Sequence, residues 1–295
     1  MIDFRIKTFL ILCKELNYTN TAKVLHITQP AVSQHIKYLE EDFGVKLFHY
    51  DGKFLQLTRE RKILYDFAIA AESSSYKTKE LMTLPVNSLA PIRFGTTLTI
   101  GEYTMPKLLK KLVIDYPTMK ISMEVSNTEI LLQKLENGEI DFALVECHFN
   151  KFKYHSYLFS QESFIGISSP NNSLSLTQIS FEEIFKERLI IREKGSGSRE
   201  IFEQILYEHN TTMENFDKVI EIGNINIIKQ LVEENIGVSF LYKEAVENEL
   251  RNKTLCKIWI TDFDVIREFN FVFLKGSLHY EEYTKWFEYF KTKRN

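Results

Sequence analysis

The chain has 295 residues, of which 44% are hydrophobic and 26% charged, and this composition is typical of globular protein and excludes a disordered chain. At about 150 residues a domain, the length predicts two or three domains. The net charge of −3 at pH 7 gives no general indication of nucleic-acid binding, but residues 1–62 carry 10 Lys and Arg against 7 Asp and Glu. A mildly basic N-terminal part on an acidic remainder points to an N-terminal module with an anionic partner.

Neither a membrane segment nor a disulfide framework is indicated. No apolar run approaches the roughly 18 residues that a membrane helix needs, and the apolar N-terminal stretch is interrupted by charges, with no cleavage site after it. Cys13, Cys147 and Cys256 are widely spaced and form no CxxC pair. We therefore expect three buried thiols in a cytoplasmic protein, with no metal, no bound cofactor and no membrane partner.

The first ninety residues predict helices and one hairpin. Apolar residues at helical spacing predict a first helix over 6–16, and a 3-4-3-4 spacing predicts a long helix over 58–84. Between them, 45–50 and 53–57 form a hairpin joined at Asp51-Gly52. Pro85 and Pro91 bracket the segment where we place the main domain boundary.

Residues 19–44 carry the sharpest signal in the sequence. Thr19 is the expected N-cap of a short helix ending at Leu25, and Thr28 that of a longer helix ending at 43, where Gly44 terminates it. The turn 26–28 makes the pair a helix-turn-helix. The side chains expected to form its interior are Ala22, Leu25, Ile27, Val32, Ile36, Leu39 and Phe43.

The start of the second helix of this motif presents polar groups to the outside. The residues expected there are Thr28, Gln29, Pro30, Ser33, Gln34 and Lys37. Amide and hydroxyl groups suit the edges of bases, and a helix N-terminus suits a phosphate. The alternative is an ordinary helical hairpin with a polar face. The hairpin that follows, with Lys46, His49 and Lys53, is typical of a wing lying on the DNA backbone and favours DNA binding.

The remainder alternates strands and helices, which predicts an α/β domain with parallel strands and crossover helices. The expected strands are 92–97, 120–125, 140–145, 163–168, 188–192, 219–223, 236–241 and 269–274. The expected helices are 103–115, 128–137, 199–209, 225–235 and 279–292.

Four strand-to-helix junctions in this region are rich in small polar residues. Ligands of open α/β sheets bind beyond the carboxyl ends of strands, where free helix N–H groups and hydroxyls suit a carboxylate or sulfate. The residues expected to bind such a ligand are Thr97, Leu98, Thr99, Ser126, Asn127, Thr128, Ser196 and Asn224. The alternative is that these residues only cap helices.

Catalysis is not indicated. Gly195-Ser196-Gly197 lacks the serine offset of a nucleophile elbow, and no phosphate-binding loop or HExxH motif occurs. Cys147 and His148 are neighbours that would point to opposite faces of a strand. Asp141 and Glu146 could be taken as paired carboxylates, but Asp141 is expected to bond at the start of a strand.

The segments 17–41 and 44–48 resemble the N-terminal signature of the LysR-type transcriptional regulators. Gly195-Ser196-Gly197-Ser198-Arg199 is similar to a Gly-Ser-Gly-Thr-Arg segment of that family, and 221–224, 228–232 and 237–241 resemble its second-subdomain core. The chain departs from the family at Tyr50, where Arg is usual, and at 58–61, where Thr-x-Ala-Gly is usual; Arg59 or Arg61 would then replace a lost phosphate contact.

The resemblance implies a winged helix-turn-helix over 1–58, a linker helix and hinge over 59–90, and an effector domain over 91–295 that resembles periplasmic binding proteins. Subdomain I would comprise 91–161 and 267–295, and subdomain II 162–266. It further implies that Gln29, Pro30, Ser33, Gln34 and Lys37 enter the major groove, and that a dimer of dimers acts at promoters, with RNA polymerase as a further partner. A binding module whose head serves only for protein contact, and a regulator with an empty cleft, are the alternatives.

The long helix is expected to join two copies of the head. At 1.5 Å per residue it spans roughly 40 Å, enough to separate two heads on successive turns of DNA. Its expected contact residues are Leu64, Phe67, Ala71, Ser74, Thr78 and Leu81. The alternative is a helix that packs on its own domain. The effector is expected to be an organic or inorganic anion that biases how the copies assemble on DNA.

Overall fold

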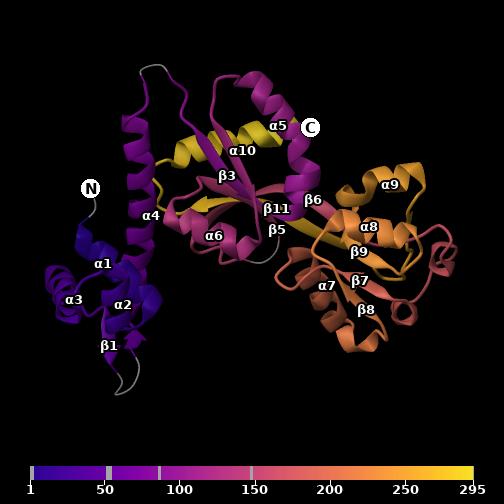
Figure 1. Cartoon of the computed structure of the whole chain (residues 1–295), viewed down its shortest axis with the longest axis horizontal. Helices are drawn as coiled ribbons and strands as arrows, with labels where there is room; N and C mark the ends of the chain where they lie inside the picture. The colour runs from indigo at the N-terminus through magenta and orange to yellow at the C-terminus, as the bar shows by residue number, and fades with distance from the viewer. Residues whose placement is uncertain (1–2, 51–54, 86–87, 147–148, 295) are drawn as a thin grey trace.

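The computed structural model describes residues 3–50, 55–85, 88–146 and 149–294. It comprises a small N-terminal head, one long helix beside it, and an elongated α/β domain with two halves (Figure 1). Within the described part of the chain no helix is long and apolar enough to cross a bilayer.

The head contains three helices and a two-stranded hairpin. Their bounds are α1 Phe4–Glu15, α2 Tyr18–Leu25, α3 Gln29–Phe43, β1 Phe48–Tyr50 and β2 Leu55–Leu57. Thr28 caps α3 and Gly44 ends it at φ 65°, as predicted. The prediction for α2 was wrong: Asn17 is its N-cap, because its side chain accepts a hydrogen bond from the Asn20 N–H. The hairpin tip, with Asp51-Gly52 and Lys53, lies outside the described residues.

The interior of the helix-turn-helix is mostly as predicted. Ala22, Val32, Ile36 and Leu39 are buried and Leu25 is half-buried. Two expected members are not interior: Ile27 is 37% and Phe43 49% exposed. Ile27 lies in the surface turn between the two helices, and Phe43 lies in the last turn of α3, where the head core ends.

The long helix α4, Arg59–Met82, contacts both the head and the α/β domain. Its residues Leu64, Ala68 and Ile69 share one apolar cluster with Phe9 of α1 and Leu131 of α6, Thr128–Asn137. The two parts of the chain are therefore joined by a common core and not only by a linker. Much of the helix packs on its own chain, which is the alternative that the sequence left open.

A buried ion-pair network ties α4 to the α/β domain. Lys77 is 3% exposed, and its Nζ lies 3.3 Å from Asp141 Oδ1 and 2.7 Å from Glu282 Oε1. Asp141 also accepts a hydrogen bond from the Arg93 N–H at 2.9 Å, at the beginning of two neighbouring strands. Asp141 therefore bonds at a strand start, as expected, and is paired with a lysine rather than with Glu146.

One mixed sheet of seven strands runs through the α/β domain, in the order β10-β6-β11-β5-β3-β4 with β9 paired to β6. The strands are β3 Ile92–Thr96, β4 Ile121–Val125, β5 Phe142–Glu146, β6 Tyr154–Ser168, β9 Ser239–Tyr242, β10 Cys256–Lys257 and β11 Val265–Leu274; β7 Leu189–Ile191 and β8 Val219–Glu221 form a separate parallel pair. The helices are α5 Met105–Asp115, α6, α7 Gly197–Glu208, α8 Ile225–Glu233, α9 Glu247–Asn252 and α10 Tyr280–Arg294.

The prediction of parallel strands holds for β3 with β4 and β5, and for β7 with β8. It was wrong for β11, which pairs antiparallel with both β5 and β6, and for β9, which pairs antiparallel with β6. These strands reach their neighbours from the opposite direction, so the local alternation of strands and helices did not reveal their orientation. β6 is also longer than predicted, and β10 and α9 were not predicted at all.

β6 and β11 run side by side between the two halves (Figure 1). The expected subdomain boundaries lie within these two strands, and Glu162 and Arg267 on either side of them are partners in the ladder. The ladder is interrupted by a register shift between Phe269 and Asn270. This pair of strands, which connects the two halves, is called the hinge below.

Candidate DNA-reading face and effector cleft

The first two turns of α3 present polar side chains to solvent, as predicted. Thr28, Gln29, Pro30, Gln34 and Lys37 are exposed. The Gln29 Nε2 donates a hydrogen bond to Ser33 Oγ at 3.0 Å, so these two side chains are hydrogen-bonded to each other in the absence of DNA. Lys37 lies 3.6 Å from Glu41 in an exposed ion pair that a phosphate can replace at little cost.

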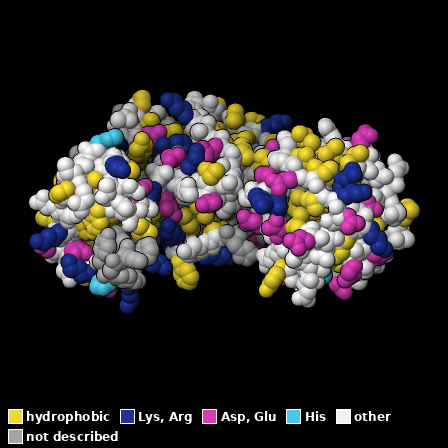
Figure 2. Space-filling view, turned by 60° about the horizontal axis from the view of Figure 1, so that its bottom comes forward, with side chains coloured by type: hydrophobic (Ala, Val, Ile, Leu, Met, Phe, Trp, Pro, Cys, Tyr) yellow, Lys and Arg dark blue, Asp and Glu magenta, His cyan; other side chains and the backbone are white. Residues whose placement is uncertain are grey.

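Contacts from α1 hold this face in place. His35 Nδ1 lies 2.9 Å from the Thr8 hydroxyl, and the Arg5 guanidinium lies 3.6 Å from the centre of the Tyr38 ring. Because α3 is anchored on its inner face, its outer groups are presented in a fixed orientation. Figure 2 shows Lys and Arg side chains scattered over the head at the left, whereas Asp and Glu gather toward the middle and right.

Glu40 positions the hairpin, a role that the sequence did not indicate. Its Oε1 accepts hydrogen bonds from the Leu47 and Phe48 N–H groups, and its Oε2 lies 2.6 Å from Lys46 Nζ. The carboxylate raises the pKa of Lys46 and stabilises its charge. A carboxylate three turns into α3 therefore fixes the start of the wing.

The two arginines after the hairpin differ in what they can contact. Arg61 is committed to the head core, because its Nε lies 3.1 Å from Cys13 Sγ and its guanidinium also donates to the Cys13 carbonyl. Arg59 is exposed. Of the two residues expected to replace the usual phosphate contact, the structure leaves Arg59 available. Cys13 is buried as expected, Cys256 is only half-buried because it lies on β10 at the sheet edge, and Cys147 lies outside the described residues.

The expected effector residues fall into two groups. Thr97, Thr99 and Ser196 are buried, and Leu98 is half-buried against the core of the second half. Ser126 and Thr128 are half-buried, and the Thr128 hydroxyl donates to the Glu146 carbonyl. Asn127 and Asn224 are exposed and cap α6 and α8 by accepting from the Ile130 and Ile227 N–H groups. For Asn127 and Asn224, the alternative that these residues cap helices is therefore confirmed.

The junctions nonetheless meet across the two halves. The Asn127 amide of the first half lies next to Gly195 of the second. Tyr103 also crosses between the halves, since its hydroxyl donates to Asn226 Oδ1 at 3.1 Å. It belongs to a π-helical turn, Ile100–Thr104, which precedes α5 where the sequence predicted only a regular helix from 103. Such turns are frequent at functional sites.

Two charged residues at these strand ends were not predicted. Glu146 ends β5 and is 2% exposed; its Oε1 accepts a hydrogen bond from the Thr99 hydroxyl at 3.3 Å. Arg192 follows β7, is 4% exposed and forms a two-pronged ion pair with Glu193. The available signal was a charged residue at the end of a wholly apolar strand, at the edge where ligands bind.

Burial raises the pKa of Glu146 to about 7, and the nearby charge of Arg192 and the hydroxyls of Thr99 and Thr97 only partly oppose this rise. The cause is the loss of water around the carboxylate. Burial also raises the pKa of Tyr103, and the nearby charge of Arg192 opposes this rise as well.

The raised pKa of Glu146 predicts a specific pH dependence. The folded chain keeps a proton that the unfolded chain loses above its ordinary pKa of 4.5, so the free energy of unfolding falls as pH rises from 4.5 to about 7. The decrease amounts to about 3 kcal/mol. Glu146→Gln should match the parent near pH 4.5 and exceed its stability above pH 7, as measured by urea unfolding. Parallel pH profiles of the two proteins would contradict the assignment.

Arg199 braces the second half, because its guanidinium is bonded to protein groups. Its Nε lies 2.7 Å from Glu203, and its Nη1 lies 2.6 Å from Glu221 and 3.2 Å from the Arg192 carbonyl. It thereby holds the start of α7 against β8 and the end of β7, next to Ser196.

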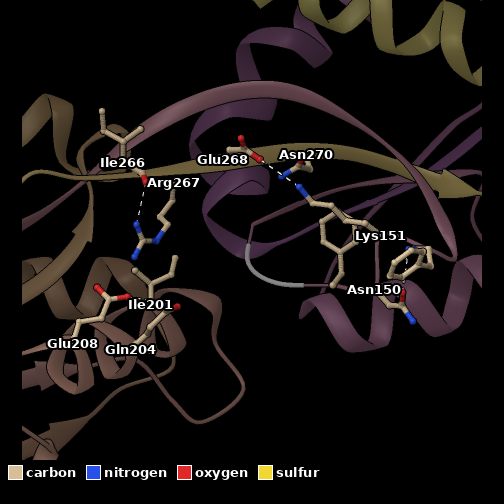
Figure 3. A pocket seen from close by; sticks show the side chains of 11 residues that line it. Asn150, Lys151, Ile201, Gln204, Glu208, Ile266, Arg267, Glu268 and Asn270 are labelled. Atoms are coloured by element: carbon tan, nitrogen blue, oxygen red, sulfur yellow. Dashed lines mark hydrogen bonds and ion pairs between the residues drawn. The ribbon is translucent and has the colours of Figure 1, made fainter. Parts of the chain in front are cut away.

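A separate cavity of about 680 Å³ lies beneath the hinge (Figure 3). The segment 149–152, α7 and β11 enclose it, and Arg267 points into it from β11. None of the eight expected effector residues lines it. Its lining combines opposite charges, among them Lys151 and Glu268 at 3.8 Å from each other.

The expected contact residues of α4 are divided by the fold. Leu64 packs into the head core, and Ser74 is buried where its hydroxyl accepts from the Leu278 N–H at 3.3 Å. Ala71 and Leu81 are half-buried and Thr78 is exposed, whereas Phe67 is 68% exposed. The open face of the helix also carries residues that were not predicted, Ile63 at 63% and Met82 at 81% exposure.

Comparison with known proteins covers nearly the whole chain. Residues 5–60 match the model of the bacterial regulatory helix-turn-helix proteins of the lysR family, and residues 89–294 match the model of the LysR substrate binding domain. The uncharacterized HTH-type transcriptional regulator MJ0300 of Methanocaldococcus jannaschii is 30% identical over 264 residues, which cover 88% of this chain and 88% of the relative.

Two solved structures show the same architecture. A mutant of OxyR from Corynebacterium glutamicum superposes with a TM-score of 0.62 at 19% identity, over 98% of this chain and 90% of that one. The regulatory domain of CcmR from Synechocystis PCC6803, solved in complex with 2-PG, superposes with a TM-score of 0.61 at 23% identity, over 68% of this chain and 96% of that one. At these identities the structures support the fold.

Proposed function

The chain belongs to the LysR family of transcriptional regulators, and we propose that it binds a dyad-symmetric promoter site as a dimer of dimers, under the control of a small effector with an acidic group. It is a regulator with a helix-turn-helix DNA-binding domain and an effector-binding domain, and the family consists of regulators rather than enzymes. Its response would be passed to RNA polymerase at the promoter in the cytoplasm.

The observation that carries the proposal is the exposed polar start of α3 on an anchored helix. Gln34 and Lys37 are unobstructed by the rest of the head, and Gln29 and Ser33 need only exchange their mutual hydrogen bond for bonds to bases. Thr28 would bring the helix N-terminus to a phosphate. Lys53 of the wing tip, which lies outside the described residues, and Arg59 would contact the backbone.

Replacing Gln34 by Ala is expected to weaken binding to the cognate site by about 1–3 kcal/mol, roughly 5- to 150-fold, because an amide paired to a base edge is lost. Binding to unrelated DNA should be nearly unchanged, since that binding depends on phosphates. Fluorescence anisotropy at fixed salt measures both affinities. Gln230→Ala, an exposed glutamine on α8, is the matched control. If Gln34→Ala leaves the ratio of the affinities for the cognate site and for unrelated DNA unchanged, α3 is not the recognition helix.

The open face of α4 is the proposed contact between two copies. Phe67, Ala71 and Thr78 remain from the expected set, and Ile63 and Met82 extend the same face. Cavities of about 650 and 450 Å³ flank Phe67, one beside the loop before α10 and one beside the end of α3, and both are apolar. A monomer rarely leaves apolar side chains of this size together in water. Leu64 and Ser74 would support this face from behind rather than touch the partner.

The effector is proposed to bind between the halves, at Thr97, Thr99 and Ser196. The N-terminus of α7 supplies oriented N–H groups for an acidic group there. The domain type is that of small-molecule effector binding, and the CcmR domain was solved with 2-PG. To act as a switch, the ligand must prefer one arrangement of the halves or copies over another.

A further inference from the structure

Glu146 is a buried carboxylate beside Thr99, one of the residues proposed to bind the effector. Its Oε2 is fully buried and has no hydrogen-bond partner among the described residues. An ionised carboxylate without a partner is costly in the interior, and one that is retained there is frequently functional. Nothing in a site built only for an anion calls for a negative group in this position.

The nearby cation, Arg192, already forms an ion pair with another residue. Arg192 donates from Nε and Nη2 to the two carboxylate oxygens of Glu193 at 2.8 Å, and its carbonyl accepts a hydrogen bond from Arg199. It therefore influences Glu146 through space without pairing to it. The Lys229 ammonium, which lies 5.0 Å from the centre of the Tyr103 ring, is paired to Glu249 at 2.7 Å. Neither Arg192 nor Lys229 therefore forms an ion pair with Glu146.

The opposite wall of the site is suited to an acidic group. Ser196 is buried at the start of α7. The hydroxyl of Ser198, two residues later, is also buried and has no hydrogen-bond partner in the described chain. The first turn of α7 adds N–H groups that have no partner within the helix. Glu146 Oε2 on one half and the Ser198 hydroxyl on the other are therefore both buried without a partner among the described residues.

We propose that the effector is a small zwitterion, whose ammonium group binds Glu146 and whose acidic group binds the start of α7. The inference rests on the proposed effector function and specifies the class of ligand. Glu146 then determines specificity, because an amine-free anion would bring a second negative charge beside it.

This ligand would also act on the hinge. Two contacts already join the halves: the Tyr103 hydroxyl donates to Asn226 Oδ1, and the Thr104 hydroxyl donates to Glu244 at 2.7 Å. Closure without an ammonium buries the charge of Glu146 unpaired, whereas closure over one pairs it. A zwitterion therefore favours the closed arrangement, which is the differential affinity that a switch needs.

The test uses the full chain at pH 8 and three matched sets of probes: the proteinogenic α-amino acids, their N-acetyl derivatives, and the corresponding acids that lack the amine. Thermal shift identifies binders and calorimetry measures their affinity. We expect at least one free amino acid to bind at least tenfold more tightly than its acetylated and amine-free counterparts. Glu146→Gln should abolish this preference, and Glu214→Gln, which changes an exposed carboxylate, should keep it.

Each other outcome overturns the inference. If amine-free or acetylated acids bind as well as the free amino acids, the ligand is an anion, and the proposed effector function stands without the zwitterion. If a free amino acid binds and Glu146→Gln retains its preference, the ammonium is held elsewhere. If no compound of the three sets binds while the parent still binds its promoter site, the zwitterion and the effector site both fall and only the DNA-binding function remains.

Discussion

Replacing Phe67 by Asp is expected to convert the protein into monomers at micromolar concentration. Phe67 is 68% exposed between two apolar cavities on the open face of α4. Loss of a buried aromatic anchor costs about 2 kcal/mol or more, and in a twofold contact each substitution counts twice. The dimer should therefore weaken by about 4 kcal/mol, roughly a thousandfold. Sedimentation analysis measures the change directly, and binding to a dyad-symmetric DNA site should weaken with it.

Tyr76→Asp is the matched control for this change. Tyr76 is an aromatic residue of the same helix and is 61% exposed. It lies nine residues after Phe67, which is about two and a half helical turns, so it faces the opposite side of the helix. It should leave the assembly unchanged. A Phe67→Asp protein that remains dimeric, with the control unaffected, would place the contact between copies on another surface.

Replacing Lys77 by Met should lower the free energy of unfolding by about 3–5 kcal/mol, the range for removing one partner of a buried ion pair. The side chains of Lys77 and Asp141 are 4% and 3% exposed, so Asp141 would lose its buried ion-pair partner with little access to water. Arg93 at 3.6 Å is its remaining cation, which places the loss toward the lower end of the range. For a domain of about 200 residues this corresponds to a fall in Tm of about 10 °C, measured by calorimetry.

Two further variants separate charge from packing at this site. Lys62→Met, at an exposed position of the same helix, should change the stability little. Lys77→Met combined with Asp141→Asn should recover part of the loss, because the remaining partner no longer carries a buried charge. A double variant as unstable as Lys77→Met would mean that the loss comes from packing of the lysine stem.

Most elements of the fold could be predicted from the sequence because they depend on neighbours in the chain. Thr28 and Gly44 mark the two ends of α3 through local capping and a left-handed turn, so its bounds were predictable. The same holds for the alternation of β3, α5, β4 and α6. The wrong N-cap of α2 shows the limit, since Asn17 and Thr19 are both good caps and only the turn after α1 selects Asn17.

The proposed effector site and the proposed α4 contact face depend on pairing between distant segments. Leu64 and Phe67 are equally apolar and lie on adjoining faces of α4, but the head covers the first and leaves the second open. Glu146 became a candidate only when the sheet placed it beside Thr99, and the second half placed Arg192 near it without pairing the two. By itself, the sequence determined the recognition helix, the domain order and the family resemblance, because periodicity, caps and motifs are local. Which polar groups are buried, and which of them lack partners, was decided only by the tertiary structure, because burial and charge compensation are properties of the space between segments.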